Sequence, residues 1–325
     1  MKKALYYKLE DDKIRCQLCP QNCLIAESKS GKCRVRKVKG SKLYATSYGE
    51  VSALNIDPIE KKPLYHFYPD SEILSLGTVG CNLSCKFCQN YSIAQEEKSQ
   101  TKTLSPEEAV ALADEKNSLG IAYTYSEPLV WYEYILATAK LARENNLQNV
   151  LVTNGMINSE PFNELIEVID AMNIDLKAFS ESFYQQLCGG MLEPVKQTIK
   201  AANKKLHLEI TTLLIPGHND SKETIEELTE WIAEIDPEIP LHLSRYFPRY
   251  QLQEQITPVE TLLKAKEIAE QKLDYVYLGN LNHQTARNTY CPNCNKLLIN
   301  RDLALEIKLK NNKCPECGKE IKIIT

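Results

Sequence analysis

The sequence predicts an α/β protein with a partial or full (β/α) barrel and two small cysteine-rich modules, one at each end. Apolar runs of strand length alternate with helical segments from about residue 71 to residue 280, as expected when a parallel sheet is buried on both faces. Seven such runs can be counted, which fits a barrel better than an open doubly wound sheet. Eleven of the twelve cysteines fall into three groups, and two of these groups lie outside the alternating region.

The expected strands and helices follow from apolar runs and start signals. The strands are expected at 72–78, 119–125, 149–153, 170–176, 206–214, 239–245 and 274–278. Three of the helices have clear starts. Ser105 to Glu108 and Thr257 to Glu260 have the pattern of capping boxes with proline at the first helical position. Asp220, with a carboxylate three residues later, predicts an acidic cap.

Three regions are expected along the chain. Residues 1–70 carry four cysteines and a β-rich lead-in, residues 71–280 form the barrel, and residues 281–325 carry two Cys-x2-Cys knuckles typical of a zinc ribbon. A chain of 325 residues is long enough for one large domain of about 200–250 residues with small modules beside it.

Composition excludes several classes of function. A net charge of −4 and a pI near 5.9 disfavour a broad nucleic-acid interface, which needs a basic face. No segment approaches the roughly 20 apolar residues of a membrane span, and the first residues lack an apolar signal core. We therefore expect a cytoplasmic protein without a membrane partner. In that compartment, cysteines indicate metal ligands before disulfides.

The most specific feature is a triplet of cysteines directly after the first expected barrel strand. Cys81, Cys85 and Cys88 have the spacing Cys-x3-Cys-x2-Cys, and the next cysteine along the chain is Cys188. A 4Fe–4S cluster normally takes four thiolates, so three leave one iron open. An open coordination position suits catalysis, whereas structural zinc sites are usually closed by four ligands.

Polar residues stand where the expected strands end. The carboxyl ends of barrel strands hold the active site. Glu127 follows the second strand, Asn154 follows the third, and Asp175 and Lys177 share one face of the fourth because they are two residues apart. The later strands are followed by 216–220, Ser244-Arg245 and Gly279-Asn280.

The triplet, with Phe87 before its last cysteine, resembles the signature of the radical S-adenosylmethionine (SAM) superfamily. The stretches 77–82, 121–128, 152–155, 174–177 and 214–217 resemble its pyruvate formate-lyase activating-enzyme branch. The stretches 16–23, 57–64, 187–190, 242–248 and 288–294 resemble the radical SAM enzyme of the AmmeMemoRadiSam system. The chain departs from the family pattern at Ser126, where asparagine is usual, and in the loop at 282–284.

The resemblance implies a barrel of the radical SAM type and an oxidoreductase. The open iron would bind the amino and carboxylate groups of SAM, and an external electron donor would drive its cleavage to a 5′-deoxyadenosyl radical that abstracts hydrogen. Glu127, Asn154, Asp175 and Lys177 map onto positions that contact SAM. Relatives form glycyl radicals in partner proteins. For this chain, a partner protein and a small molecule both stay open as substrate.

The two flanking cysteine groups indicate metal sites. Cys291, Cys294, Cys314 and Cys317 predict zinc. Cys16, Cys19, Cys23 and Cys33 are compatible with zinc or with a second iron–sulfur cluster, and their wide last gap favours zinc. A competing hypothesis is a non-catalytic zinc-binding scaffold or partner-docking protein. It gives no reason for Glu127, Asn154, Asp175 and Lys177 to gather at one barrel end.

Six further residues receive first interpretations. Tyr123 and Tyr125 are candidates for packing against adenine, and His242 and Arg245 are candidates for the site. Cys188 is interpreted as a packed thiol and His66 as a half-buried structural histidine.

Overall fold

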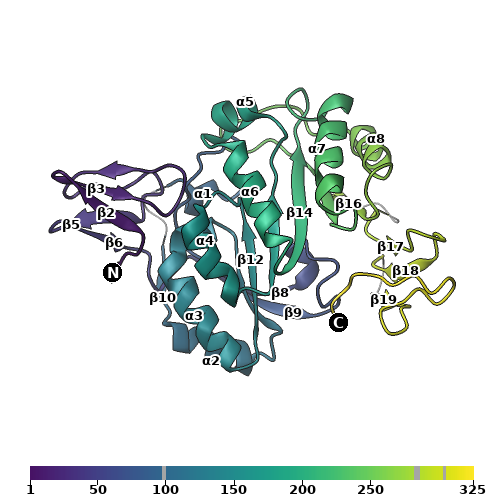
Figure 1. The fold of residues 1–325 in the computed structure, drawn as a ribbon, viewed down its shortest axis with the longest axis horizontal. Coiled ribbons are helices and arrows are strands. Elements are labelled where there is room, and N and C mark those ends of the chain that lie inside the picture. The colour runs from purple at the N-terminus through teal and green to yellow at the C-terminus, as the bar shows by residue number, and fades with distance from the viewer. Residues whose placement is uncertain (97–99, 282–285, 303–304) are drawn as a thin grey trace.

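A mixed eight-stranded sheet forms the body of the molecule (Figure 1). The computed structural model describes residues 1–96, 100–281, 286–302 and 305–325. The loop at 282–284, where the sequence departs from the family pattern, lies outside the described residues. The strands follow the spatial order β16-β15-β14-β13-β12-β11-β9-β8. Their bounds are β8 Ala53–Pro58, β9 Glu72–Gly77, β11 Gly120–Tyr123, β12 Gln148–Thr153, β13 Ala171–Asp175, β14 His207–Leu214, β15 Leu241–Arg245 and β16 Val276–Gly279.

The seven predicted barrel strands are confirmed. Strands β9 to β16 of this sheet run parallel to one another, and β8 adds an antiparallel edge beside β9. Among the described residues, β8 and β16 each pair with one neighbour only within this sheet. The structure is therefore a partial barrel, the first of the two predicted forms.

Helices connect the parallel strands and pack along one face of the sheet (Figure 1). They are α1 Tyr91–Ala94, α2 Pro106–Glu115, α3 Tyr132–Glu144, α4 Ser159–Leu165, α5 Glu181–Phe183, α6 Leu192–Ala202, α7 Lys222–Ile235 and α8 Val259–Ala269. Short 3-10 turns cover Ile59–Lys61, Pro128–Trp131 and Ile166–Val168, and a π-helical turn covers Tyr184–Cys188.

Helices begin within one residue of all three predicted start signals, but only one of the three predicted caps is confirmed. Ser105 forms the expected capping box with Glu108, with bonds of 3.2 Å and 2.7 Å. Helix α7 is instead capped by Ser221, while the Asp220 carboxylate accepts a bond from the Gly217 amide. Thr257 does not cap α8, because its buried hydroxyl donates to the Leu214 carbonyl at 2.7 Å. At α8 a bond to a distant segment takes the place of the expected local cap, whereas at α7 the neighbouring serine caps the helix.

Replacing Ser105 by alanine is expected to lower the free energy of unfolding by about 1 kcal/mol, because the Glu108 amide loses its acceptor. Urea unfolding followed by circular dichroism measures this. Ser105→Thr keeps the oxygen and is the matched control. Equal losses in both variants would show that the capping bond contributes nothing.

A buried polar cluster closes the barrel interior below the strand ends. The Glu209 carboxylate on β14 accepts bonds from the His66 amide at 2.7 Å, from His207 Nε2 at 2.9 Å and from His242 Nε2 at 2.6 Å. Burial alone would raise the pKa of Glu209, but the two histidines hold it below its usual range. His66 is fully buried rather than half-buried. The interpretation of His242 as a site residue is therefore wrong.

Small sheets lie at the two ends of the barrel (Figure 1). At the N-terminal end, β1 Lys2–Lys3, β6 Lys42–Ala45 and β5 Arg36–Lys39 form one sheet, and β2 Tyr7–Glu10, β3 Lys13–Cys16 and β4 Leu24–Ile25 form another. Strand β7 Glu50–Val51 pairs with β10 Lys102–Thr103. At the C-terminal end, a third three-stranded sheet is formed by β17 Thr289–Tyr290, β18 Leu297–Asn300 and β19 Glu306–Ile307.

Candidate active site

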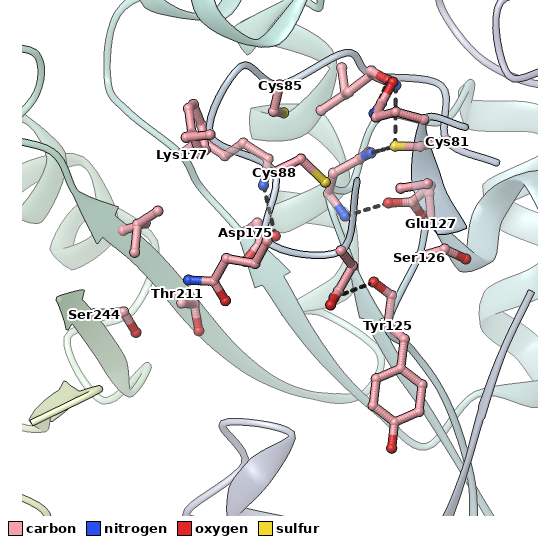
Figure 2. A pocket seen from close by; sticks show the side chains of 18 of the residues that line it. Cys81, Cys85, Cys88, Tyr125, Ser126, Glu127, Asp175, Lys177, Thr211 and Ser244 are labelled. Carbon is pink, nitrogen blue, oxygen red and sulfur yellow. Dashed lines mark hydrogen bonds and ion pairs between the residues drawn. The ribbon is translucent and has the colours of Figure 1, made fainter. Parts of the chain in front are cut away.

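A cavity of about 230 Å³ opens at the carboxyl ends of the parallel strands (Figure 2). All seven parallel strands contribute to its wall, either through their own residues or through the segments that follow them. The predicted site residues that line it are Cys81, Cys85, Cys88, Glu127, Asn154, Asp175, Lys177, Ser244 and Asn280. Residues scattered over two hundred positions of sequence are therefore brought to one place.

The cysteine triplet lies on the loop after β9 and faces this cavity (Figure 2). The loop is held by the segment before Gly189: the Ser84 amide donates to the Cys188 carbonyl at 2.8 Å, and the Lys86 amide to the Leu187 carbonyl at 2.9 Å. Burial raises the pKa of Cys88 to about 11. The Cys188 thiol bonds to Cys85 and lowers the pKa of Cys85.

The spread of the three sulfurs tests which metal group they can hold. A set whose ligand atoms all lie within 4.8 Å of one another suits a single ion, and within the described residues only the C-terminal cysteines form such a set. The triplet is not such a compact set among the described residues, and all three of its cysteines border the open cavity. Thiolates that bind different irons of one cluster require a wider spacing than the ligands of a single ion. The donor set and the cavity fit a 4Fe–4S group.

Glu127 begins the turn after β11 with its carboxylate buried at the cavity wall. Oε1 accepts bonds from Thr153 Oγ1 at 2.6 Å and from the Leu129 amide at 3.0 Å, and Oε2 accepts one from the Asn154 amide at 2.9 Å. Burial nevertheless raises the pKa of Glu127 to about 7. Its carboxylate is fixed in position and retains capacity for another donor, since a carboxylate offers about four acceptor sites.

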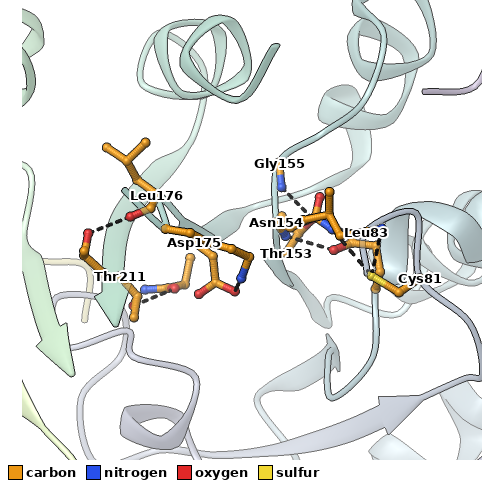
Figure 3. A network of polar contacts seen from close by, with 12 residues as sticks. Cys81, Leu83, Thr153, Asn154, Gly155, Asp175, Leu176 and Thr211 are labelled. Carbon is orange, nitrogen blue, oxygen red and sulfur yellow. Dashed lines mark hydrogen bonds and ion pairs between the residues drawn. The ribbon is translucent and has the colours of Figure 1, made fainter. Parts of the chain in front are cut away.

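Asn154 contacts the cysteine loop directly (Figure 3). Its Nδ2 lies 3.7 Å from Cys81 Sγ and donates to Asn82 Oδ1 at 2.8 Å, while its Oδ1 accepts from the Met156 amide at 2.9 Å. Both ends of the amide are thus engaged by the protein. The side chain therefore fixes a hydrogen-bond donor beside the Cys81 sulfur. Where such a sulfur binds a metal group, a hydrogen bond of this kind tunes that group.

Asp175 and Lys177 form an ion pair at the cavity wall, with Lys177 Nζ 2.8 Å from Asp175 Oδ2 (Figure 2). The Lys177 side chain is 14% exposed and that of Asp175 is 38% exposed. Burial alone would lower the pKa of Lys177, but the Asp175 carboxylate raises it well above its usual value. The pair therefore presents one fixed cation and one accessible carboxylate to the cavity.

Some predicted side chains are not brought to the site, and others were missed. Tyr123 is fully buried and donates to Asn149, so it cannot contact a ligand in the cavity. Arg245 donates to the Thr257 carbonyl outside the cavity wall. Tyr125 lines the cavity, although its ring points away from the sulfurs (Figure 2). The missed residues include Thr211 and Leu213 on β14, which the two-residue alternation with Glu209 would have indicated.

The two flanking cysteine groups differ in geometry. Cys291, Cys294, Cys314 and Cys317 have all four sulfurs within 4.8 Å of one another, with contacts of 3.5 Å and 3.6 Å across the group. This spacing fits one tetrahedral ion. Cys16, Cys19, Cys23 and Cys33 line a separate small pocket and do not form such a set.

Comparison with known proteins gives the family. The model of the Radical SAM superfamily matches residues 75–232, and an uncharacterized protein of Methanocaldococcus jannaschii is 42% identical over 335 residues, covering 100% of both chains. The chain belongs to the radical SAM superfamily. The pyruvate formate-lyase 1-activating enzyme of Escherichia coli strain K12 is 24% identical to this radical SAM protein over 163 residues, 48% of this chain and 66% of that enzyme. The superfamily match and the named activating-enzyme relative place it as a radical SAM enzyme related to pyruvate formate-lyase activating enzymes.

A solved structure shares the radical SAM fold. Streptococcus suis SuiB bound to S-adenosylmethionine aligns with a TM-score of 0.51 at 16% identity, over 64% of this chain and 52% of that one. Membership of the superfamily implies a 4Fe–4S cluster and SAM as cofactors. None of the described helices is both long enough and apolar enough to cross a bilayer.

Proposed function

We propose that this radical SAM enzyme holds its 4Fe–4S cluster through Cys81, Cys85 and Cys88, with SAM at the fourth iron. The observation that carries the proposal is that three spaced thiols, a fixed carboxylate and an ion pair line one cavity at the strand ends. When bound, the reduced cluster would supply one electron to break the carbon–sulfur bond of SAM and yield a 5′-deoxyadenosyl radical.

The protein side chains would bind and orient SAM. Glu127 would accept a bond from the methionyl ammonium through its remaining acceptor capacity, and Lys177 would pair with the methionyl carboxylate. Asp175, the more exposed partner, would accept bonds from the ribose hydroxyls. Charge-assisted bonds of this kind are roughly twice as strong as neutral ones. Asn154 would act mainly through the Cys81 thiolate that it contacts.

We further propose a glycine of a partner protein as the hydrogen donor, with an external carrier supplying electrons in the cytoplasm. The support is the relative named as an activating enzyme. Residues 1–70, 71–280 and 281–325 would act as a metal module, the radical SAM barrel and a zinc-ribbon module. The C-terminal four cysteines would hold zinc, and the N-terminal four would hold zinc or a second cluster.

Anaerobic reconstitution with iron and sulfide, reduction with dithionite and addition of SAM are expected to yield 5′-deoxyadenosine. Liquid chromatography measures it, with air-oxidised protein as the control. A zinc-binding scaffold would instead remain colourless and leave SAM intact. An iron-loaded, reducible protein that never cleaves SAM would contradict the proposed function.

A further inference from the structure

We propose that Cys16, Cys19, Cys23 and Cys33 hold a second 4Fe–4S cluster rather than zinc, and that it passes electrons to the cluster at Cys81, Cys85 and Cys88. The first part stands on the geometry of the N-terminal module. The second part rests also on the proposed function.

The C-terminal cysteines provide an internal reference for sulfur spacing. A tetrahedral zinc site with Zn–S bonds of about 2.3 Å sets its sulfurs about 3.8 Å apart. The pairs Cys291–Cys317 and Cys294–Cys314 stand at 3.5 Å and 3.6 Å, close to that value. The four N-terminal cysteines all lie among the described residues, yet they do not form a compact group of this kind. They surround a pocket instead, as thiolates on four different irons must.

The walls of this pocket suit an anionic cluster. Arg36 is buried at the pocket wall and pairs with Glu133 at 2.9 Å. Its Nε and Nη1 are buried, and neither has a hydrogen-bond partner among the described residues. A buried donor without a hydrogen-bond acceptor destabilises the fold. The inorganic sulfides of an iron–sulfur cluster would supply acceptors for these donors, whereas a zinc ion would supply none. The Lys32 amide already points at Cys23 Sγ, at 3.4 Å.

The pocket abuts the active-site loop on both sides of Cys81. Asn82 lines the N-terminal pocket together with the four cysteines, and it also accepts a bond from Asn154. On the other side, a Cβ on Gly80 would stand 2.5 Å from the Cys33 carbonyl oxygen. One residue on each side of Cys81 therefore touches the N-terminal cysteines, which places the two proposed clusters next to each other.

The charge of the module fits an acidic electron carrier. Residues 1–70 hold fourteen lysines and arginines against eight acidic residues, and residues 1–45 alone hold twelve against four, although the whole chain has a net charge of −4. Seven of these cations are exposed: Lys2, Lys3, Lys8, Lys29, Lys37, Lys39 and Lys42. Such an excess of exposed positive charge steers an acidic partner to this end of the molecule.

The electron count of the proposed relay is one per SAM cleaved. A low-potential one-electron protein carrier would be oxidised and the N-terminal cluster reduced from the 2+ to the 1+ state. That electron would then reduce the cluster at Cys81, Cys85 and Cys88, which returns to 2+ when the carbon–sulfur bond of SAM breaks. The products are methionine and the 5′-deoxyadenosyl radical, so charge and atoms balance.

The identity of the metal is tested in the full chain with Cys81→Ala, Cys85→Ala and Cys88→Ala combined. After anaerobic reconstitution we expect about four irons and about four sulfides per chain, and about eight of each in the wild type. The remaining electron paramagnetic resonance signal should not respond to SAM. A second zinc per chain with no iron overturns the proposal. Four irons in the wild type would overturn it even if the triple variant failed to fold.

The electron route is tested with Cys16→Ala and Cys19→Ala combined. We compare 5′-deoxyadenosine formation driven by reduced flavodoxin, an acidic carrier, with formation driven by dithionite, which is small enough to reduce the active-site cluster directly. We expect the ratio of the two rates to fall several-fold from that of the wild type. An unchanged ratio overturns the relay. Absence of SAM cleavage by the wild-type protein would instead contradict the proposed function. Failure of the relay and failure of the proposed function therefore give different results.

Discussion

Replacing Cys85 by alanine is expected to reduce 5′-deoxyadenosine formation to the background of the assay. Cys85 is one of only three thiols that border the cavity, and two thiolates cannot replace the third corner of a cluster that already lacks one protein ligand. Chromatography of reduced, SAM-supplied protein measures the loss. Iron analysis of the same sample is expected to show that the active-site cluster is missing.

Cys188 offers a matched control for this substitution. Its thiol is fully buried and bonds to Cys85, but it does not line the cavity. Cys188→Ala removes a neighbouring sulfur of the same size and should leave the iron content unchanged. If Cys85→Ala retained its iron and its cleavage of SAM, while Cys188→Ala lost both, the assignment of ligands would be wrong.

The sequence predicted best what local spacing determines. The triplet lies within eight residues of one loop, so its pattern is recognisable from the sequence alone. The seven parallel strands are apolar runs whose length and separation can be recognised in the sequence. Parallel strands all have their carboxyl ends at one edge of the sheet. Knowing where the strands end was therefore enough to predict that Glu127, Asn154, Asp175 and Lys177 lie together.

Contacts between distant segments account for what the sequence did not predict. Thr257 has the local pattern of a cap, but its hydroxyl donates to the carbonyl of Leu214, forty-three residues away in the sequence. His242 lies on β15 and is polar, but the carboxylate of Glu209 on β14 holds it inside the barrel. The metal of the N-terminal cysteines also could not be predicted, because thiolates suit both zinc and iron and sulfur spacing is a property of the folded module.

Replacing Lys177 by glutamine is expected to weaken SAM binding by roughly 10–100-fold, because a bond to a charged group contributes about 1.5–3 kcal/mol. Lys177 is the buried cation of the cavity wall, and Asp175 keeps its ammonium in place. The Asp175 carboxylate is 38% exposed, so water can solvate it when its partner is lost and the fold should persist. Calorimetry on the reconstituted, oxidised protein measures affinity without turnover.

Lys61 is the matched control for Lys177. It also pairs with an aspartate, Asp57 at 3.1 Å, but its side chain is 68% exposed and lies outside the cavity. Lys61→Gln removes the same charge at a solvated site, where an ion pair contributes at most about 1 kcal/mol. A loss of affinity in Lys177→Gln alone would locate the methionyl carboxylate at the strand β13 end. Equal losses in both variants would point to a general effect of net charge, and unchanged affinity in Lys177→Gln would exclude this contact.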